Sequence, residues 1–146
     1  MLISCTLKNA QVYLPTVAKT EAGFYMNREP VAVVPASDAD ALRRELRKLL
    51  KHGNPAIPTP KRDALPRPVL LKYAGERSWS AFMRGASEWD IYEKDGKYQI
   101  TPYRKDPEGS QNWVADSERR LTFPLGTSAD EVIERMIVIL QQAAQQ

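Results

Sequence analysis

Hydrophobic and polar residues alternate with a period of two along the first part of the chain, up to residue 35. Four short runs, at residues 2–7, 11–18, 23–26 and 31–34, are separated by turn-forming residues such as Asn9 and Asn27. This alternation is typical of strands that bury one face, so we expect an antiparallel meander. Pro15 cannot donate to a strand ladder, and its strand should therefore lie at a sheet edge or carry a bulge.

From residue 38 to residue 52 the period changes to that of an amphipathic helix. The expected buried stripe consists of Ala39, Leu42, Leu46, Leu49 and Leu50. Ser37 is the expected N-cap, with Asp40 completing a variant capping box, and Gly53 is the expected left-handed stop. The opposite face is basic and carries Arg43, Arg44, Arg47, Lys48 and Lys51 around a single acid, Glu45.

Residues 54–68 contain five of the eleven prolines. That density excludes a regular helix or a central strand. A chain of 146 residues is the size of one typical domain. We therefore expect a single domain in which this proline-rich crossover joins the meander and first helix (1–53) to a second part (69–146).

The second part opens with residues 69–73, which are apolar except for Lys72 and predict a central strand. Ser78 is then expected to cap a short helix. Trp79, Phe82 and Met83 recur at helical spacing in that helix, so they predict a face that packs in the core.

A β-hairpin is predicted around Asp95-Gly96, because this dipeptide suits the two positive-φ positions of a type I′ turn. On one face of the hairpin we expect the pairs Trp89 with Pro102, Ile91 with Ile100, and Glu93 with Tyr98. On the other face we expect the pairs Glu88 with Tyr103, Asp90 with Thr101, and Tyr92 with Gln99. The first face is mostly apolar, and the second should meet water or a partner.

A polar loop at residues 103–112 and a short strand pair at 113–115 and 119–123 lead to the last helix. That helix begins with the capping box of Ser128 and Glu131. Its stretch 132–140 is apolar round most of the circumference, so it should be the most buried helix, with residues 141–146 fraying. The order of elements predicts an α+β fold: a mainly antiparallel β-sheet with this long C-terminal helix and the basic amphipathic helix packed on it.

Composition is that of a globular protein, with 42 % hydrophobic and 27 % charged residues. No apolar run reaches the length of about 18 residues that a membrane helix needs, and the N-terminus lacks the pattern of a signal peptide. We therefore expect a cytoplasmic protein without a membrane partner.

Residues suited to catalysis are sparse. One cysteine, Cys5, excludes an internal disulfide, and with one histidine, His52, it leaves too few ligands for structural zinc. No P-loop, GxGxxG, HExxH or EF-hand motif is present. The pair Glu88 and Asp90 could bind a hard cation or act as acid and base, but its expected place on an exposed face favours solvated charges. We expect a protein that is not an enzyme and has no cofactor.

Charge is distributed unevenly along the chain. Residues 42–84 hold eleven Lys or Arg against three acids, whereas residues 88–118 hold eight acids against four bases. A basic helix beside a basic loop would suit nucleic acid or an acidic protein. An acidic hairpin with exposed tyrosines would suit a basic protein.

Several segments between residues 68 and 140 carry a family resemblance. They are the run VLLKY at 69–73, SWSAF at 78–82, WDI at 89–91, the Asp95-Gly96 hairpin, and the helix start TSADE at 127–131. Their succession resembles the small bacterial immunity proteins (CdiI-type) of contact-dependent growth inhibition systems. The resemblance implies a cytoplasmic antitoxin that binds the C-terminal toxin domain of a matching effector, often a nuclease, and blocks its active site.

Candidate partner-binding residues come from the acidic hairpin face and the loop after it, because charge and tyrosine together are typical of protein interfaces. They are Glu88, Asp90, Tyr92, Glu93, Tyr103, Asp106 and Glu108. The alternative is a nucleic-acid-associated or regulatory protein that uses the basic helix 38–52. For that helix we expect weak and nonspecific nucleic-acid binding at most.

Overall fold

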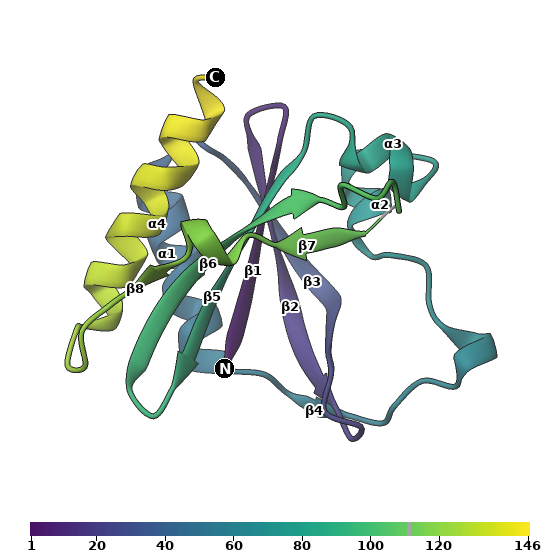
Figure 1. The fold of residues 1–146 in the computed structure, drawn as a ribbon, viewed down its shortest axis with the longest axis horizontal. Helices are drawn as coiled ribbons and strands as arrows, with labels where there is room; N and C mark the ends of the chain where they lie inside the picture. The colour runs from purple at the N-terminus through teal and green to yellow at the C-terminus, as the bar shows by residue number, and fades with distance from the viewer. Residues whose placement is uncertain (111) are drawn as a thin grey trace.

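The computed structural model describes residues 1–110 and 112–146 and has the α+β fold predicted from the sequence (Figure 1). The strands are β1 (Leu2–Lys8), β2 (Gln11–Thr20), β3 (Tyr25–Pro35), β4 (Ala56–Ile57), β5 (Ser87–Lys94), β6 (Lys97–Lys105), β7 (Trp113–Ala115) and β8 (Leu121–Thr122). The helices are α1 (Ala39–His52), α2 (Leu70–Ala74), α3 (Trp79–Met83) and α4 (Ala129–Ala144), with 3₁₀ turns η1 (Arg62–Ala64) and η2 (Ser117–Arg119).

The sheet has the strand order β3-β2-β1-β5-β6-β7, with β4 on β2 and β8 on β6. Its pairs are antiparallel except for the short pair of β2 with β4. β1 lies between β2 and β5, so the first strand of the chain joins the meander to the hairpin within one sheet.

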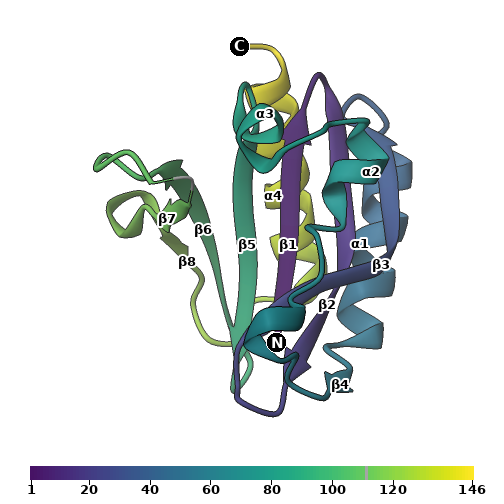
Figure 2. The same cartoon turned by 90° about the vertical axis from the view of Figure 1, so that its right-hand side faces the viewer.

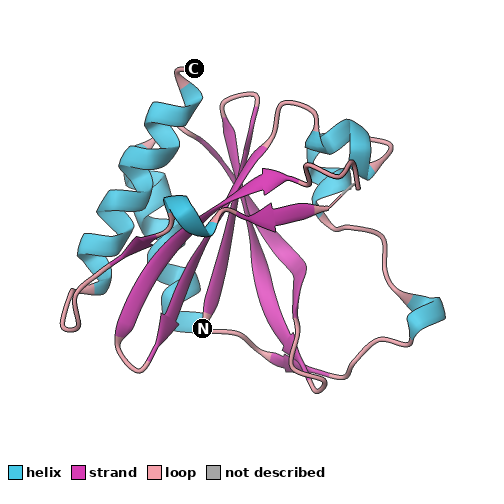
Figure 3. Cartoon of the chain, in the orientation of Figure 1, coloured by secondary structure: helices cyan, strands magenta, loops and turns pink. Residues whose placement is uncertain are grey.

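Helices cover both faces of this sheet (Figures 2 and 3). α1 and α4 lie on one face, over a cluster that includes Cys5, Ile91 and Leu140. α2 and α3 lie on the other face, over a smaller cluster that includes Tyr13 and Phe82. Burial of Cys5, expected from its alternation with apolar neighbours, is confirmed.

The meander differs from expectation in one respect. The segments expected at 23–26 and 31–34 belong to one long strand, β3, that pairs with β2 along its length. The irregularity expected at Pro15 is confirmed, because the register shifts between Pro15 and Thr16. Proline has no N–H to donate to the neighbouring strand, so a bulge at this position avoids a missing hydrogen bond in the regular ladder.

Both long helices begin at side-chain caps. The N-cap of α1 is Asp38, whose carboxylate accepts from the Ala41 N–H, so the expectation of Ser37 was wrong by one residue. Ser128 caps α4 as expected, accepting from the Glu131 N–H at 3.2 Å. α4 is less enclosed than expected, since Val138 is 44 % exposed, and it continues through Ala144 rather than fraying from residue 141.

The expected central strand at residues 69–73 was wrong, because this segment is helix α2. Leu70 and Leu71 are buried against the second face of the sheet, and Gly75 ends the helix in the left-handed conformation with φ of 70°. A five-residue apolar run fits a buried strand and a buried helical turn equally well. The following glycine marked the helix, since Gly in this conformation is a common helix stop.

The proline-rich segment crosses the surface as expected. It contains only the two-residue strand β4 and the turn η1, and residues 61–68 are all exposed. Figure 1 shows the segment extending away from the sheet before it returns to α2.

The hairpin of β5 and β6 has the predicted turn. Asp95 and Gly96 both adopt positive φ, at 54° and 77°. The predicted pairs are confirmed for Trp89 with Pro102, Asp90 with Thr101, Ile91 with Ile100, Tyr92 with Gln99, and Glu93 with Tyr98. The pairing of Glu88 with Tyr103 is not formed, because the ladder ends at Trp89 and Pro102.

Replacing Ile137 by alanine tests the packing of α4. Ile137 is 3 % exposed, so its truncation should lower the free energy of unfolding by about 2 to 5 kcal/mol. Val138→Ala, on the outward side of the same helix, is the matched control and should cost less than about 1 kcal/mol. Urea denaturation measures both, and equal losses would contradict this orientation of the helix.

Candidate functional site

The acidic face of the hairpin continues onto β1. Asp90 and Glu88 of β5 lie directly opposite Ser4 and Thr6 of β1, so the four side chains share one face of the sheet. Asp90 is only 7 % exposed. The expectation that Asp90 meets solvent was therefore wrong.

Hydroxyl groups surround the two carboxylates. The Tyr103 hydroxyl on β6 donates to Asp90 Oδ2, and the Ser4 hydroxyl donates to Glu88 Oε1 at 3.3 Å. On the far side of Asp90, Arg120 donates from Nε to the Thr101 hydroxyl at 3.0 Å. Asp90 thus holds the phenol ring of Tyr103 in place.

Burial disfavours the ionised form of both carboxyl groups. It raises the pKa of Glu88 from 4.5 to about 7, with the charge of Asp90 as the second cause. Burial also raises the pKa of Asp90, from 3.8 to about 6, against the opposing effect of the Tyr103 hydrogen bond. The pKa of Tyr103 is raised by burial and by Asp90. Two neighbouring acids with raised pKa values are typical of a functional site.

A groove opens beside Glu88, where the two strands of the hairpin separate. After the pair of Trp89 and Pro102, β6 pairs with β7 instead of β5, and Figure 2 shows it leaning away. The groove has a volume of about 660 Å³. Its lining includes Glu88, Trp89, Tyr103, Arg119, the Asn9-Ala10 turn, and Ile139 and Ala143 near the end of α4.

The turn at the mouth of this groove is strained. Asn9 and Ala10 join β1 to β2 with φ of 51° and 61°. Alanine in the left-handed region costs about 1 to 2 kcal/mol, because its Cβ approaches the following carbonyl. Strain of this kind tends to gather at functional sites.

The structure brings together three of the seven candidate residues, Glu88, Asp90 and Tyr103. Tyr92 and Glu93 lie further along β5, toward the hairpin turn, where Glu93 accepts from the Gly96 N–H at 2.9 Å. Asp106 and Glu108 lie beyond β6, where the Asp106 carboxylate accepts from the Glu108 N–H at 2.9 Å and from the Ser110 hydroxyl. Residue 111 of the expected loop lies outside the described residues.

Sequence reasoning missed the contributions of β1, η2 and α4 to this site. Ser4 and Thr6 alternate with Ile3, Cys5 and Leu7, so the polar face of β1 was readable. Its pairing with β5 was not readable, because the two strands are about 85 residues apart in the sequence.

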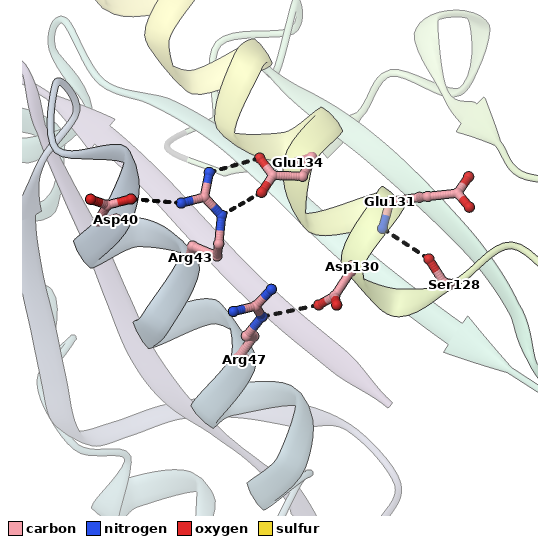
Figure 4. A network of polar contacts seen from close by, with 7 residues as sticks. All are labelled: Asp40, Arg43, Arg47, Ser128, Asp130, Glu131 and Glu134. Atoms are coloured by element: carbon pink, nitrogen blue, oxygen red, sulfur yellow. Dashed lines mark hydrogen bonds and ion pairs between the residues drawn. The ribbon is translucent and has the colours of Figure 1, made fainter.

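The basic face of α1 is partly neutralised by α4 (Figure 4). Arg43 makes a two-pronged ion pair with Glu134 and also contacts Asp40 at 2.8 Å. Arg47 contacts Asp130 at 3.0 Å. The expected basic surface on this helix is therefore only partly available to a partner.

A second groove, of about 750 Å³, lies between α1 and strands β2 and β3. Its floor is apolar and includes Leu14, Val31 and Leu49, and His52 lies at its rim. Among the described residues, no group of three or more His, Cys, Asp or Glu side chains is placed to hold a metal ion. None of the described helices is both long enough and apolar enough to span a membrane.

Comparison with known proteins identifies the fold. No family model matches the sequence, and no curated protein matches it. A protein of unknown function from Neisseria meningitidis has a similar structure, with a TM-score of 0.62 at 14 % identity, over 98 % of this chain and 92 % of that chain. A chain of a CdiA-CT/CdiI toxin and immunity complex from Yersinia pseudotuberculosis also has a TM-score of 0.62, at 13 % identity, over 98 % of this chain and 95 % of its own length.

The raised pKa values predict that the fold is stabilised by acid. Glu88 and Asp90 have folded-state pKa values of about 7 and 6, above their ordinary values of 4.5 and 3.8. The folded state therefore binds protons more tightly, and this contribution to stability is complete below about pH 4 and lost as the pH rises through about 7. Asp90→Asn should remove much of this dependence and raise the free energy of unfolding at pH 8 by about 2 kcal/mol.

Urea denaturation of parent and variant at pH 5 and pH 8 measures the effect. The matched control is Asp95→Asn at the exposed hairpin turn, where asparagine also suits the backbone. A difference between Asp90→Asn and the parent that is equal at both pH values would contradict the raised pKa.

Proposed function

We propose that this chain is an immunity protein of a contact-dependent growth inhibition system, which binds and neutralises the C-terminal toxin domain of a cognate effector. The observation that carries the proposal is the similarity in fold to a chain of a toxin and immunity complex, over 98 % of this chain and 95 % of that one. The independent resemblance of residues 68–140 to the same class of proteins agrees with it. The proposed role is binding, with no catalytic step.

The groove between β5 and β6 supports a protein partner. Glu88 and Tyr103 line the groove. Asp90 does not line it, but its carboxylate accepts a hydrogen bond from the Tyr103 hydroxyl and so fixes that side chain. A fixed tyrosine beside a carboxylate is a common centre of an interface, because its ring adds contact area at little entropic cost. The remaining candidates form the proposed rim and are Tyr92, Glu93, Asp106 and Glu108.

The nucleic-acid alternative has less support from the geometry. Arg43 and Arg47, the central cations of the basic helix, are already held by the acids of α4. Their use for phosphate would first require those ion pairs to separate. Arg44, Lys48 and Lys51 remain more exposed and would give at most weak, nonspecific attraction to nucleic acid.

Protection of cells tests the proposed function. The proposal predicts a gene for a large secreted effector beside this one. The C-terminal domain of that effector should stop growth when expressed alone, and co-expression of this chain should restore growth. An antitoxin must stay bound at low concentration, so the complex should have a dissociation constant in the nanomolar range or below. This corresponds to a binding free energy of about −12 kcal/mol or more favourable. Unprotected cells, together with the absence of a complex in calorimetry, would overturn the proposal.

Tyr103→Ala tests the placement of the interface. Truncating a central tyrosine commonly costs about 2 kcal/mol or more of binding free energy, so dissociation from the toxin domain should accelerate by at least about tenfold. The matched control is Tyr25→Ala on β3, a half-buried tyrosine that does not line this groove. Surface plasmon resonance measures both rates, and equal effects of the two variants would place the interface elsewhere.

A further inference from the structure

The ammonium group of Lys8 is buried between strand β1 and helix α3. Lys8 is the last residue of β1, and its side chain is 8 % exposed. Nζ donates to the carbonyl oxygens of Ala81 and Phe82, each at 2.8 Å. It also forms an ion pair with Glu76 at 3.0 Å and lies 5.4 Å from the centre of the Phe82 ring. Lysine is almost never buried unless it is paired, and these contacts hold the ammonium in one place.

The same contacts join two backbone segments that flank the groove between β5 and β6. Asn9 and Ala10, which follow Lys8 directly, line one side of the groove. Gly85 and Ser87 line another side, and they come directly after the last turn of α3, where Lys8 contacts the carbonyl groups. Among the described residues, the lining includes the neighbours of Lys8 in the sequence but not Lys8 itself.

The backbone ladder between these segments stops beside Lys8. β1 pairs with β5 as far as Leu7 and Ser87. Past that pair one chain continues into the Asn9-Ala10 turn, with positive φ at both residues, and the other leads back to the five-residue helix α3. Alanine is strained in the left-handed region, and a helix this short is marginal alone. The Lys8 side chain therefore continues the connection where the ladder ends.

We infer that Lys8 is a positioning residue for the proposed partner interface, because its ammonium holds two sides of the groove at the separation that the toxin domain requires. This inference rests on the proposed function and names a residue that acts without touching the partner. A groove that is already formed in the free protein lowers the cost of ordering it on binding. Where the groove is formed only part of the time, the apparent affinity falls in proportion to that fraction.

Hydrogen exchange tests this clamp without the toxin. The Ala86 and Ala36 amides report on the two sides of the groove, because they donate to the Met83 and Ala10 carbonyls. Lys8→Met keeps most of the length of the side chain but removes the charge and the donors, so exchange at both amides should accelerate by at least about tenfold. Lys8→Arg retains a charge and donors and should restore most of the protection.

Lys72→Met is the matched control for the exchange experiment. Lys72 also forms an ion pair with a glutamate, Glu29, and lies 5.3 Å from the centre of an aromatic ring, that of Tyr73. Its side chain is 67 % exposed, however, and it does not line this groove. Its replacement should leave both reporter amides unchanged. Equal protection in Lys8→Met and the parent, or equal losses in Lys8→Met and Lys72→Met, would overturn the inference.

Binding kinetics distinguish positioning from direct contact. Because Lys8 does not touch the partner, Lys8→Met should slow association with the toxin domain by about fivefold or more and leave dissociation unchanged. Tyr103→Ala, which removes a contact, should instead accelerate dissociation. Leu46→Ala controls for overall stability, since Leu46 is fully buried on α1 and does not line the groove. Once its concentration is corrected for the folded fraction, this variant should keep both rates of the parent.

The outcomes separate this inference from the proposed function. A parent chain that binds the toxin domain, with Lys8→Met binding at the same rate, would overturn the positioning role and leave the immunity role in place. Faster dissociation of Lys8→Met with unchanged association, or slower association shared by Leu46→Ala, would also overturn it. A parent chain that does not bind would overturn the proposed function and with it the partner role of Lys8, whereas hydrogen exchange would still decide whether Lys8 holds the groove.

Discussion

The central position of strand β1 is the constraint on which the rest of the structure depends. It pairs with β2 on one side and with β5 on the other, so one short strand joins the meander to the hairpin. Its alternation sends Cys5 into the layer under α1 and α4, and Ser4 and Thr6 to the opposite face. A slip by one residue would bury these hydroxyls among aliphatic side chains, which no partner there could satisfy. The same alternation that holds the core together therefore creates the polar surface beside Glu88.

Helix α4, on the apolar face of the sheet, forms one wall of the groove. α4 is held against the sheet by Val132, Met136 and Leu140, which are fully buried. Its ion pairs with α1 lie at the surface, where such pairs contribute at most about 1 kcal/mol each. These ion pairs orient α4 along α1 more than they stabilise the fold. Because α4 is held along its length, its last turn presents Ala143 to the fork between β5 and β6.

Local signals allowed much of this fold to be predicted. The Asp95-Gly96 turn set the hairpin register, and Gly53 and Ser128 marked helix ends, since each rule acts within a few residues. Asp90 was misplaced because the hairpin was considered alone. Its second face becomes an interior surface only when β1 pairs with β5, and that pairing joins segments far apart in the sequence. Helix α2 was missed because five apolar residues have no distinguishing period.

The groove carries features that burden the free protein. Glu88 lies partly buried without an ion-pair partner among the described residues, and Ala10 adopts a left-handed conformation at the mouth. These two costs conflict with the local consistency of the rest of the sheet, and proteins tend to retain conflicts of this kind where function requires them. A partner that supplies a cation to Glu88 would relieve the first cost on binding. The free energy withheld from folding would then appear as affinity for that partner.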